Sequence, residues 1–133
     1  MTERHIYITE TDLDRLEEII QNHSSAAAQD LENELANAIV VPSTDIPPDV
    51  VTMNSRVVFE DVQSGERNTV TLVYPSRADA SAGCISVLAP VGVALLGLRV
   101  GQTIDWSVPA GRVRQLRIVE VLYQPEASGD LHL

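Results

Sequence analysis

The sequence predicts an α+β fold in which a short helical hairpin precedes an antiparallel sheet with one short helix. Up to residue 41, apolar residues recur every three or four positions, as in helices. Beyond residue 49 they occur in short β-like runs separated by turn residues. Between these regions, three prolines in Val41–Pro48 end any helix. We therefore expect a hairpin over 1–41, a stiff proline-rich linker over 42–48 and a sheet domain over 49–133.

The first region is expected to form two antiparallel helices packed as a short coiled coil. Thr9 or Thr11 can cap the first helix. The apolar face of that helix contains Leu13, Leu16, Ile19 and Ile20. The second helix places its apolar face at Ala27, Leu31, Leu35, Ala38 and Ile39. The polar residues that form the predicted tip between the helices are Asn22, His23, Ser24 and Ser25. With roughly 12–15 residues per arm and ~1.5 Å per residue, the hairpin would be about 20 Å long.

In the second region, proline and glycine fit the two ends of one helix, Pro90–Gly97. The strands are predicted at Arg56–Glu60, Arg67–Tyr74, Cys84–Leu88, Thr103–Val108 and Val113–Tyr123. Turns are predicted at Gln63–Glu66 and Pro109–Gly111. Alternation in the last run is imperfect, which indicates that both of its faces are partly covered.

The formal charge of −10 is unevenly distributed along the chain. Residues 1–49 carry eleven acids and two arginines, whereas residues 50–133 carry eight acids and seven arginines. An acidic N-terminal region is repelled by nucleic acid and attracted by a basic protein surface. The charges alone fit solvated helix faces equally well. The nine arginines form no cluster interleaved with aromatics, so we expect no sequence-specific binding of nucleic acid.

Several other classes of protein and site are not indicated. No apolar run is long enough for a membrane span, and the N-terminus is unlike a signal peptide, which predicts a cytoplasmic protein that does not bind membranes. Cys84 is the single cysteine and is interpreted as a buried small apolar residue. His5, His23 and His132 are scattered, so neither a metal nor another cofactor is expected. Arg112 and Arg114 share a strand face that could meet acids of a partner or of the hairpin, although a solvated face explains them too.

Longer motifs indicate a family. Ser86–Gly101, with a proline-started helix, an Ala-Leu-Leu core and a Val-Gly turn, resembles the C-terminal domain of the Gre transcript-cleavage factors. Pro109–Gly111 and Ile118–Tyr123 continue that similarity. Within the Gre-like proteins, the chain most resembles the family of regulators of nucleoside diphosphate kinase, the Rnk family. That resemblance is carried by Asp49–Val57, Thr71–Pro75 and Tyr123–Ala127.

The resemblance implies a C-terminal fold like that of FK506-binding proteins and docking at the rim of the secondary channel of RNA polymerase. The docking residues it implies are Leu88, Ala89 and Pro90, at the corner where a strand meets the helix. The alternative is that Pro90 only starts the helix and Leu88 only fills the core. The family is also linked to the level of nucleoside diphosphate kinase, by a route that the sequence does not reveal.

In Gre factors, a pair of carboxylates at the hairpin tip helps to hold a second Mg²⁺ for RNA cleavage. The predicted tip of this chain, Asn22–Ser25, contains no carboxylate, and Asp30 and Glu32 lie roughly 9 Å or more behind it. We therefore predict a monomeric RNA polymerase-binding regulator that competes with Gre factors, has no catalytic residues and stimulates no cleavage.

Two other functions remain open. The implied fold would suit a peptidyl-prolyl isomerase, whose pocket requires aromatic residues. Those available are Tyr7, Phe59, Tyr74, Trp106 and Tyr123. The chain could also be an adaptor that binds nucleoside diphosphate kinase, or another protein, through the hairpin.

Overall fold

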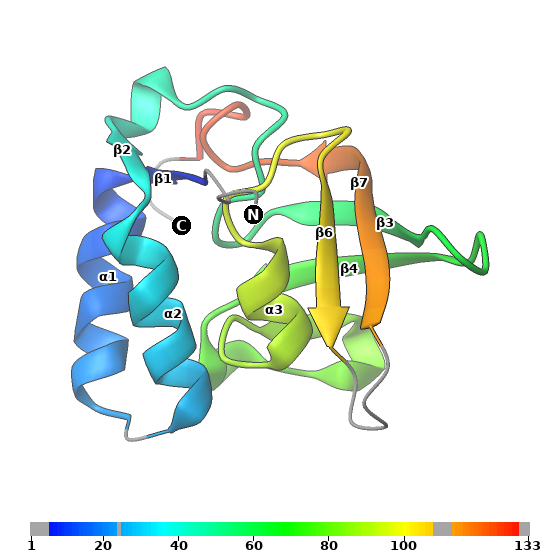
Figure 1. The fold of residues 1–133 in the computed structure, drawn as a ribbon. Helices are drawn as coiled ribbons and strands as arrows, with labels where there is room; N and C mark the ends of the chain where they lie inside the picture. The colour runs from blue at the N-terminus through cyan, green and yellow to red at the C-terminus, as the bar shows by residue number, and fades with distance from the viewer. Residues whose placement is uncertain (1–5, 24, 108–112, 131–133) are drawn as a thin grey trace.

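The computed structural model describes residues 6–23, 25–107 and 113–130 of the chain. It shows an α+β protein with a helical hairpin on one side and a twisted sheet on the other (Figure 1). The short helix α3 (Pro90–Leu95) lies between the hairpin and the strands of the sheet in Figure 1. No helix in the described residues is long and apolar enough to cross a membrane.

The hairpin consists of α1 (Glu10–Gln21) and α2 (Ala26–Ala36), which run side by side in opposite directions (Figure 1). Thr9 caps α1, as one of the two predicted alternatives, because its Oγ1 accepts a hydrogen bond from the Asp12 backbone N–H at 3.1 Å. Ser25 caps α2 in the same way through the Ala28 backbone N–H. At ~1.5 Å per residue, the 12 residues of α1 span about 18 Å.

Two short strands at the base of the hairpin were not predicted. β1 (Tyr7–Thr9) pairs in parallel with β2 (Ile39–Val41). The helical assignment of Ala38 and Ile39 was wrong, because α2 ends at Ala36, and Ile39 is 42% exposed. The β-branched run at 39–41 instead forms an extended segment that closes the base of the hairpin.

The second unit is a sheet of five strands in the order β5-β4-β3-β7-β6. The expectation of an antiparallel sheet was wrong for one pair, since β4 and β5 are parallel and the sheet is mixed. The chain does not make a hairpin after β4 but crosses over through two 3₁₀ turns, so it re-enters in the same direction. The strands are β3 (Arg56–Asp61), β4 (Arg67–Val73), β5 (Cys84–Ser86), β6 (Thr103–Ser107) and β7 (Val113–Tyr123).

A bulge explains the imperfect alternation of the last strand. Phe59 of β3 is paired with Ile118, but Val58 is paired with Glu120, which leaves Val119 as the extra residue. Leu116 and Ile118 are buried before the bulge, and Val121 packs against the core after it. The inward-facing positions therefore change from even to odd residue numbers along β7.

The proline-rich segment is packed against the rest of the molecule. It contains a 3₁₀ turn at Ser43–Asp45 and the buried Ile46. Gln124, which is 2% exposed, donates its side-chain N–H groups to the carbonyls of Pro47 and Val50, each at 2.8 Å. These bonds connect the residue that follows Tyr123 to the segment that joins the hairpin to the sheet.

One hydrophobic core serves both units. Leu16, Leu31 and Leu35 of the hairpin belong to the same buried cluster as residues of the sheet and α3. The members from the second unit include Met53, Val57, Leu72, Leu95, Leu96 and Ile118. The hairpin therefore buries its apolar face against the sheet unit, and α2 contacts α3 directly.

Candidate functional site

The predicted docking corner follows β5 and is held by its own backbone. The Leu88 N–H donates to Ser86 Oγ at 3.0 Å, and the Ala89 N–H donates to the Ser86 carbonyl at 2.9 Å. Ala89 is the extended residue before α3, and Pro90 is the first residue of that helix. The pyrrolidine side chain of Pro90 lies outside the described residues. Leu88 is half-buried and packs against the core, so part of its surface is available for contact and part is structural.

A close crossing fixes the direction in which α3 leaves this corner. A Cβ atom on Gly92 would lie 2.2 Å from the Ser86 carbonyl oxygen, so no side chain fits there. Glycine is required because the helix crosses directly over the end of β5. The shape of the corner thus depends on a residue two positions beyond it.

The predicted tip connects α1 to α2 by polar residues. The backbone N–H groups of Asn22 and His23 satisfy carbonyls at the end of α1, and the Asn22 side chain donates to the Glu18 carbonyl at 3.0 Å. Ser25 is the cap of α2, while Ser24 lies outside the described residues. The carboxylates nearest to the turn in sequence, Glu18 and Asp30, both lie within the helices. The turn itself contains no carboxylate.

The predicted tip connects α1 to α2, whereas the docking corner leads into α3. The two are linked through the contact between α2 and α3. An open groove at the end of the hairpin is lined by residues of both helices and of their connection, among them Ile20, His23 and Glu32. Among the described residues, no group of three or more His, Cys, Asp or Glu side chains could hold a metal ion.

Sequence reasoning missed a buried polar contact between the hairpin and the sheet unit. Asp12 is only 3% exposed, and its carboxylate accepts hydrogen bonds from the Met53 backbone N–H at 3.1 Å and the Tyr74 hydroxyl at 3.4 Å. Burial raises the pKa of Asp12 to about 6, and the nearby charge of Glu126 acts in the same direction. The available signal was spacing, because Asp12 lies four residues before Leu16 on the apolar face.

A second buried cluster lies next to this contact in the chain, because Thr52 and Ser55 flank Met53. The Thr52 hydroxyl is 2.8 Å from the Ser55 hydroxyl and donates to the Glu126 carboxylate at 2.7 Å. Thr52 and Ser55 are buried, and both of their hydroxyl groups have partners. Satisfied buried networks of this kind fix a single geometry. The segment 52–55 therefore fixes the positions of the hairpin, the sheet and the C-terminal turn (residues 125–129) relative to one another.

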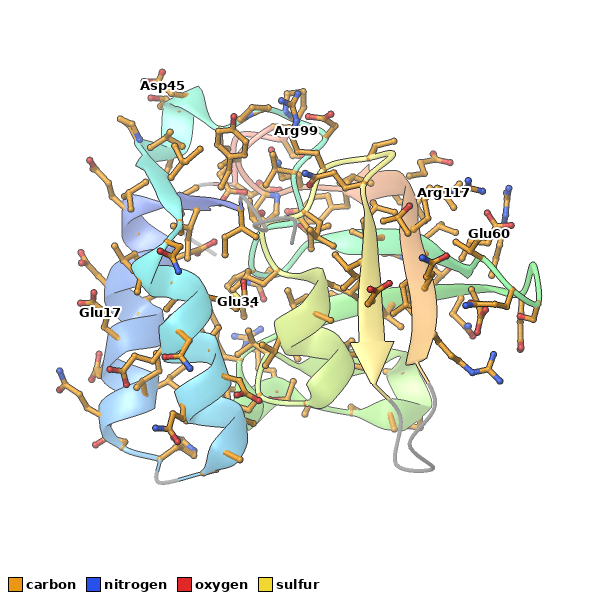
Figure 2. The ribbon with its side chains drawn as sticks, in the orientation of Figure 1. Glu17, Glu34, Asp45, Glu60, Arg99 and Arg117 are labelled. Carbon is orange, nitrogen blue, oxygen red and sulfur yellow. The ribbon has the colours of Figure 1, made fainter. Side chains whose placement is uncertain are left out.

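Three arginines of the second unit are neutralised within the chain. Arg117 lies 2.6 Å from Glu60 (Figure 2), Arg114 pairs with Asp61 and Arg99 pairs with Asp49 at 3.1 Å. The hydrogen bond from Arg114 holds the pKa of Asp61 below its usual value. Arg114 thus meets an acid on the neighbouring strand, whereas Arg112 lies outside the described residues. The hairpin also carries exposed acids, for example Glu17, which points away from the molecule (Figure 2).

The aromatic residues considered for an isomerase pocket have separate structural roles. Phe59 is in the core, Tyr74 contacts Asp12, Tyr123 donates to Asp130 and Tyr7 lies 5.8 Å beneath the Arg99 guanidinium. The side chain of Trp106 lies outside the described residues. The interpretation of Cys84 as a buried residue was wrong, since the residue is partly exposed at the start of β5.

Two family models match this chain. Residues 4–41 match the family model described as "Rnk N-terminus", and residues 46–123 match "Transcription elongation factor, GreA/GreB, C-term". The chain is 43% identical over 133 residues to the regulator of nucleoside diphosphate kinase of Escherichia coli K12, and the match covers 98% of both proteins. The chain belongs to the Rnk family.

Other relatives of this Rnk-family chain are named as transcription elongation factors. It is 39% identical over 93 residues to GreA of Desulfovibrio desulfuricans, which covers 70% of this chain and 57% of that protein. Among solved structures, a prokaryotic transcription elongation factor GreA/GreB from Nitrosomonas europaea has a TM-score of 0.77 at 50% identity. That match covers 91% of this chain and 100% of the other.

These relatives make the chain a regulator related to transcription factors with a Gre-like fold. The proteins that it resembles are named as regulators or transcription factors. The expected likeness to FK506-binding proteins finds no support in these comparisons and stays a prediction.

Proposed function

We propose that this Rnk-family chain binds RNA polymerase near the secondary channel and competes there with Gre factors without stimulating transcript cleavage. The proposal is carried by one combination. A Gre-like C-terminal unit spans residues 46–123. The hairpin that precedes it ends in a turn, Asn22–Ser25, that contains no carboxylate.

The docking half of the proposal assigns contact with the channel rim to Leu88, Ala89 and Pro90. Ala89 lies half-buried at a corner whose backbone is fixed by Ser86, so the surface is preformed. A preformed apolar surface binds with little loss of conformational entropy. RNA polymerase is the proposed partner, and it would be met in the cytoplasm.

The cleavage half rests on the chemistry of Mg²⁺. This ion prefers carboxylate oxygens in near-octahedral geometry, and the neutral Asn22 and Ser25 side chains supply weaker ligands. The α1 arm is only about 18 Å long. A hairpin of this length without a carboxylate in its turn fits occupation of the channel entrance better than delivery of a metal ion.

The decisive experiment measures displacement of a labelled Gre factor from core RNA polymerase, together with RNA cleavage in backtracked complexes. Displacement with loss of cleavage supports the proposal. Gre-like stimulation of cleavage would refute its second half, and no displacement at high excess would refute its first half.

Two substitutions map the contact. Ala89→Arg places a long charged side chain at the corner, and Ala89 makes no side-chain cap bond that could be lost. Thr69→Arg is the matched control on β4, where the residue is exposed. We expect Ala89→Arg to weaken displacement at least about tenfold, equivalent to about 1.4 kcal/mol. Thr69→Arg should leave it unchanged, and equal effects would remove the assignment to this corner.

The link to nucleoside diphosphate kinase is proposed to be indirect and to act through transcription. The relative in Escherichia coli is named as a regulator of that enzyme. Co-purification of this chain with nucleoside diphosphate kinase in the absence of polymerase would instead establish the adaptor function.

A further inference from the structure

The groove at the end of the hairpin has a composition that the proposed function does not explain. Its volume is about 500 Å³, and it is lined by Ile20 of α1, by His23 and Ser25 of the connection and by residues in the first two turns of α2. The half-buried Ile20 and the exposed Ala26 supply apolar surface. The groove is therefore large enough for one long side chain of a partner and has a surface against which an aliphatic stem can pack.

One wall of the groove carries a carboxylate. Ser25, Gln29 and Glu32 follow one another at spacings of four and three residues, so they share a face of α2. Within the described part of the chain, the Glu32 carboxylate has no hydrogen bond or ion pair, and the residue is exposed. Its negative charge is free to meet a partner.

The connection between the helices contributes a second acceptor, His23. The His23 Nδ1 atom lies 2.8 Å from the Ile19 carbonyl oxygen. A carbonyl oxygen can only accept, so Nδ1 carries the proton of this bond. In the neutral imidazole, the other ring nitrogen, Nε2, is then left as an acceptor.

The groove thus combines a carboxylate, an imidazole acceptor and apolar surface, and none of its lining residues is a lysine or an arginine. Such a site favours a cation that has several N–H donors and an aliphatic stem. Arginine fits best, because its planar guanidinium offers five donors and is more weakly hydrated than an ammonium ion. A metal ion is disfavoured, since no group of three or more metal-ligating side chains is found in the described residues.

We propose that the groove between Ile20, His23 and Glu32 receives an arginine side chain of the partner protein. The inference rests on the proposed function, in which that partner is RNA polymerase. It goes further by assigning the hairpin a specific contact with a basic residue, in place of a general attraction between its acidic surface and a basic channel.

The test compares two variants that lose the same charge. Glu32→Gln removes the carboxylate of the groove, whereas Glu17→Gln removes an exposed carboxylate of α1 that points away from α2 (Figure 2). Polymerase affinity is measured by displacement of a labelled Gre factor. We expect Glu32→Gln to weaken binding about tenfold and Glu17→Gln to change it by less than about twofold. Equal losses would overturn the proposal, because they would indicate long-range attraction alone.

A second measurement is independent of polymerase. Isotope-labelled full-length protein is titrated with ethylguanidinium while the backbone amide resonances are followed. Shifts confined to Ala28, Gln29 and Glu32, and absent in Glu32→Gln, support the proposal even if the wild type fails to bind polymerase. Shifts of similar size around Glu17, or none near Glu32, count against it. Failure of the groove is thereby distinguished from failure of the proposed function.

Discussion

Asp12 makes the stability of the fold depend on pH. Its pKa of about 6 lies above the usual 3.8, chiefly because burial disfavours the charged form. Between about pH 3.8 and about pH 6, the folded chain binds more protons than the unfolded chain. The free energy of unfolding therefore falls as pH rises through this range. The contribution of Asp12 is fully present below about pH 3.8 and is lost as pH rises through about 6.

We predict that Asp12→Asn removes this slope. In the wild type, this contribution to the free energy of unfolding falls by roughly 2 kcal/mol between pH 4 and pH 7. The amide oxygen can still accept from the Met53 N–H, so at neutral pH the variant should be at least as stable as the wild type. Urea unfolding at a series of pH values measures the difference. The exposed Asp14→Asn on the same helix is the control and should retain the wild-type slope.

Gly97 is required for two separate reasons. Its φ of +80° is unfavourable for other residues, and a Cβ atom there would lie 2.5 Å from Ile6 Cβ. The Gly97 carbonyl also accepts from the Tyr7 N–H of β1 at 3.2 Å. The glycine therefore allows the N-terminal strand to pack against the sheet unit.

We predict that Gly97→Ala destabilises the chain by about 3 kcal/mol or more, because overpacking adds to the backbone strain. Gly129 has nearly the same φ, +79°, with nothing within 4 Å of the added Cβ. Gly129→Ala should therefore cost only about 1 kcal/mol. Chemical denaturation measures both, and equal losses would show that backbone strain alone matters at Gly97.

Among the elements, the C-terminal turn has a large effect on stability for its size. It follows β7 and folds back so that Gln124 bonds the carbonyls of Pro47 and Val50. We predict that Gln124→Leu costs about 1–3 kcal/mol, because the Val50 carbonyl loses its hydrogen bond and the Pro47 carbonyl retains the longer one from the Val50 N–H at 3.2 Å. Gln21→Leu, an exposed change in α1, should cost little. Hydrogen exchange should localise the loss to residues around 47–52, and protection unchanged there would contradict the assigned role.

For the whole molecule, the shared core makes the hairpin part of the fold. Leu16, Leu31 and Leu35 cover buried residues of the sheet unit, including Met53 and Leu96. Removing the hairpin would expose that apolar surface to water. We predict that a fragment of residues 46–133 binds a hydrophobic dye and unfolds with a lower, broader transition than the full chain. A fragment as cooperative as the full chain would show that the two units fold independently.

The sequence by itself determined the elements whose cause is local. The 3.6-residue period of the hairpin helices, the Thr9 cap, the proline start of α3 and the neutral turn at Asn22–Ser25 can each be read from neighbouring residues. Strand positions also followed from short apolar runs, and the family followed from motifs in 86–101 and 49–57.

Only the tertiary structure decided what depends on residues far apart in the chain. The parallel pairing of β4 with β5, the phase change at Val119 and the strand at Ile39 each require a partner that local periodicity does not name. The same holds for Asp12, whose carboxylate meets Met53 and Tyr74, 41 and 62 residues away. An amphipathic pattern records that a residue is buried but not which group it meets, because hydrophobic burial is non-directional and hydrogen bonding is specific.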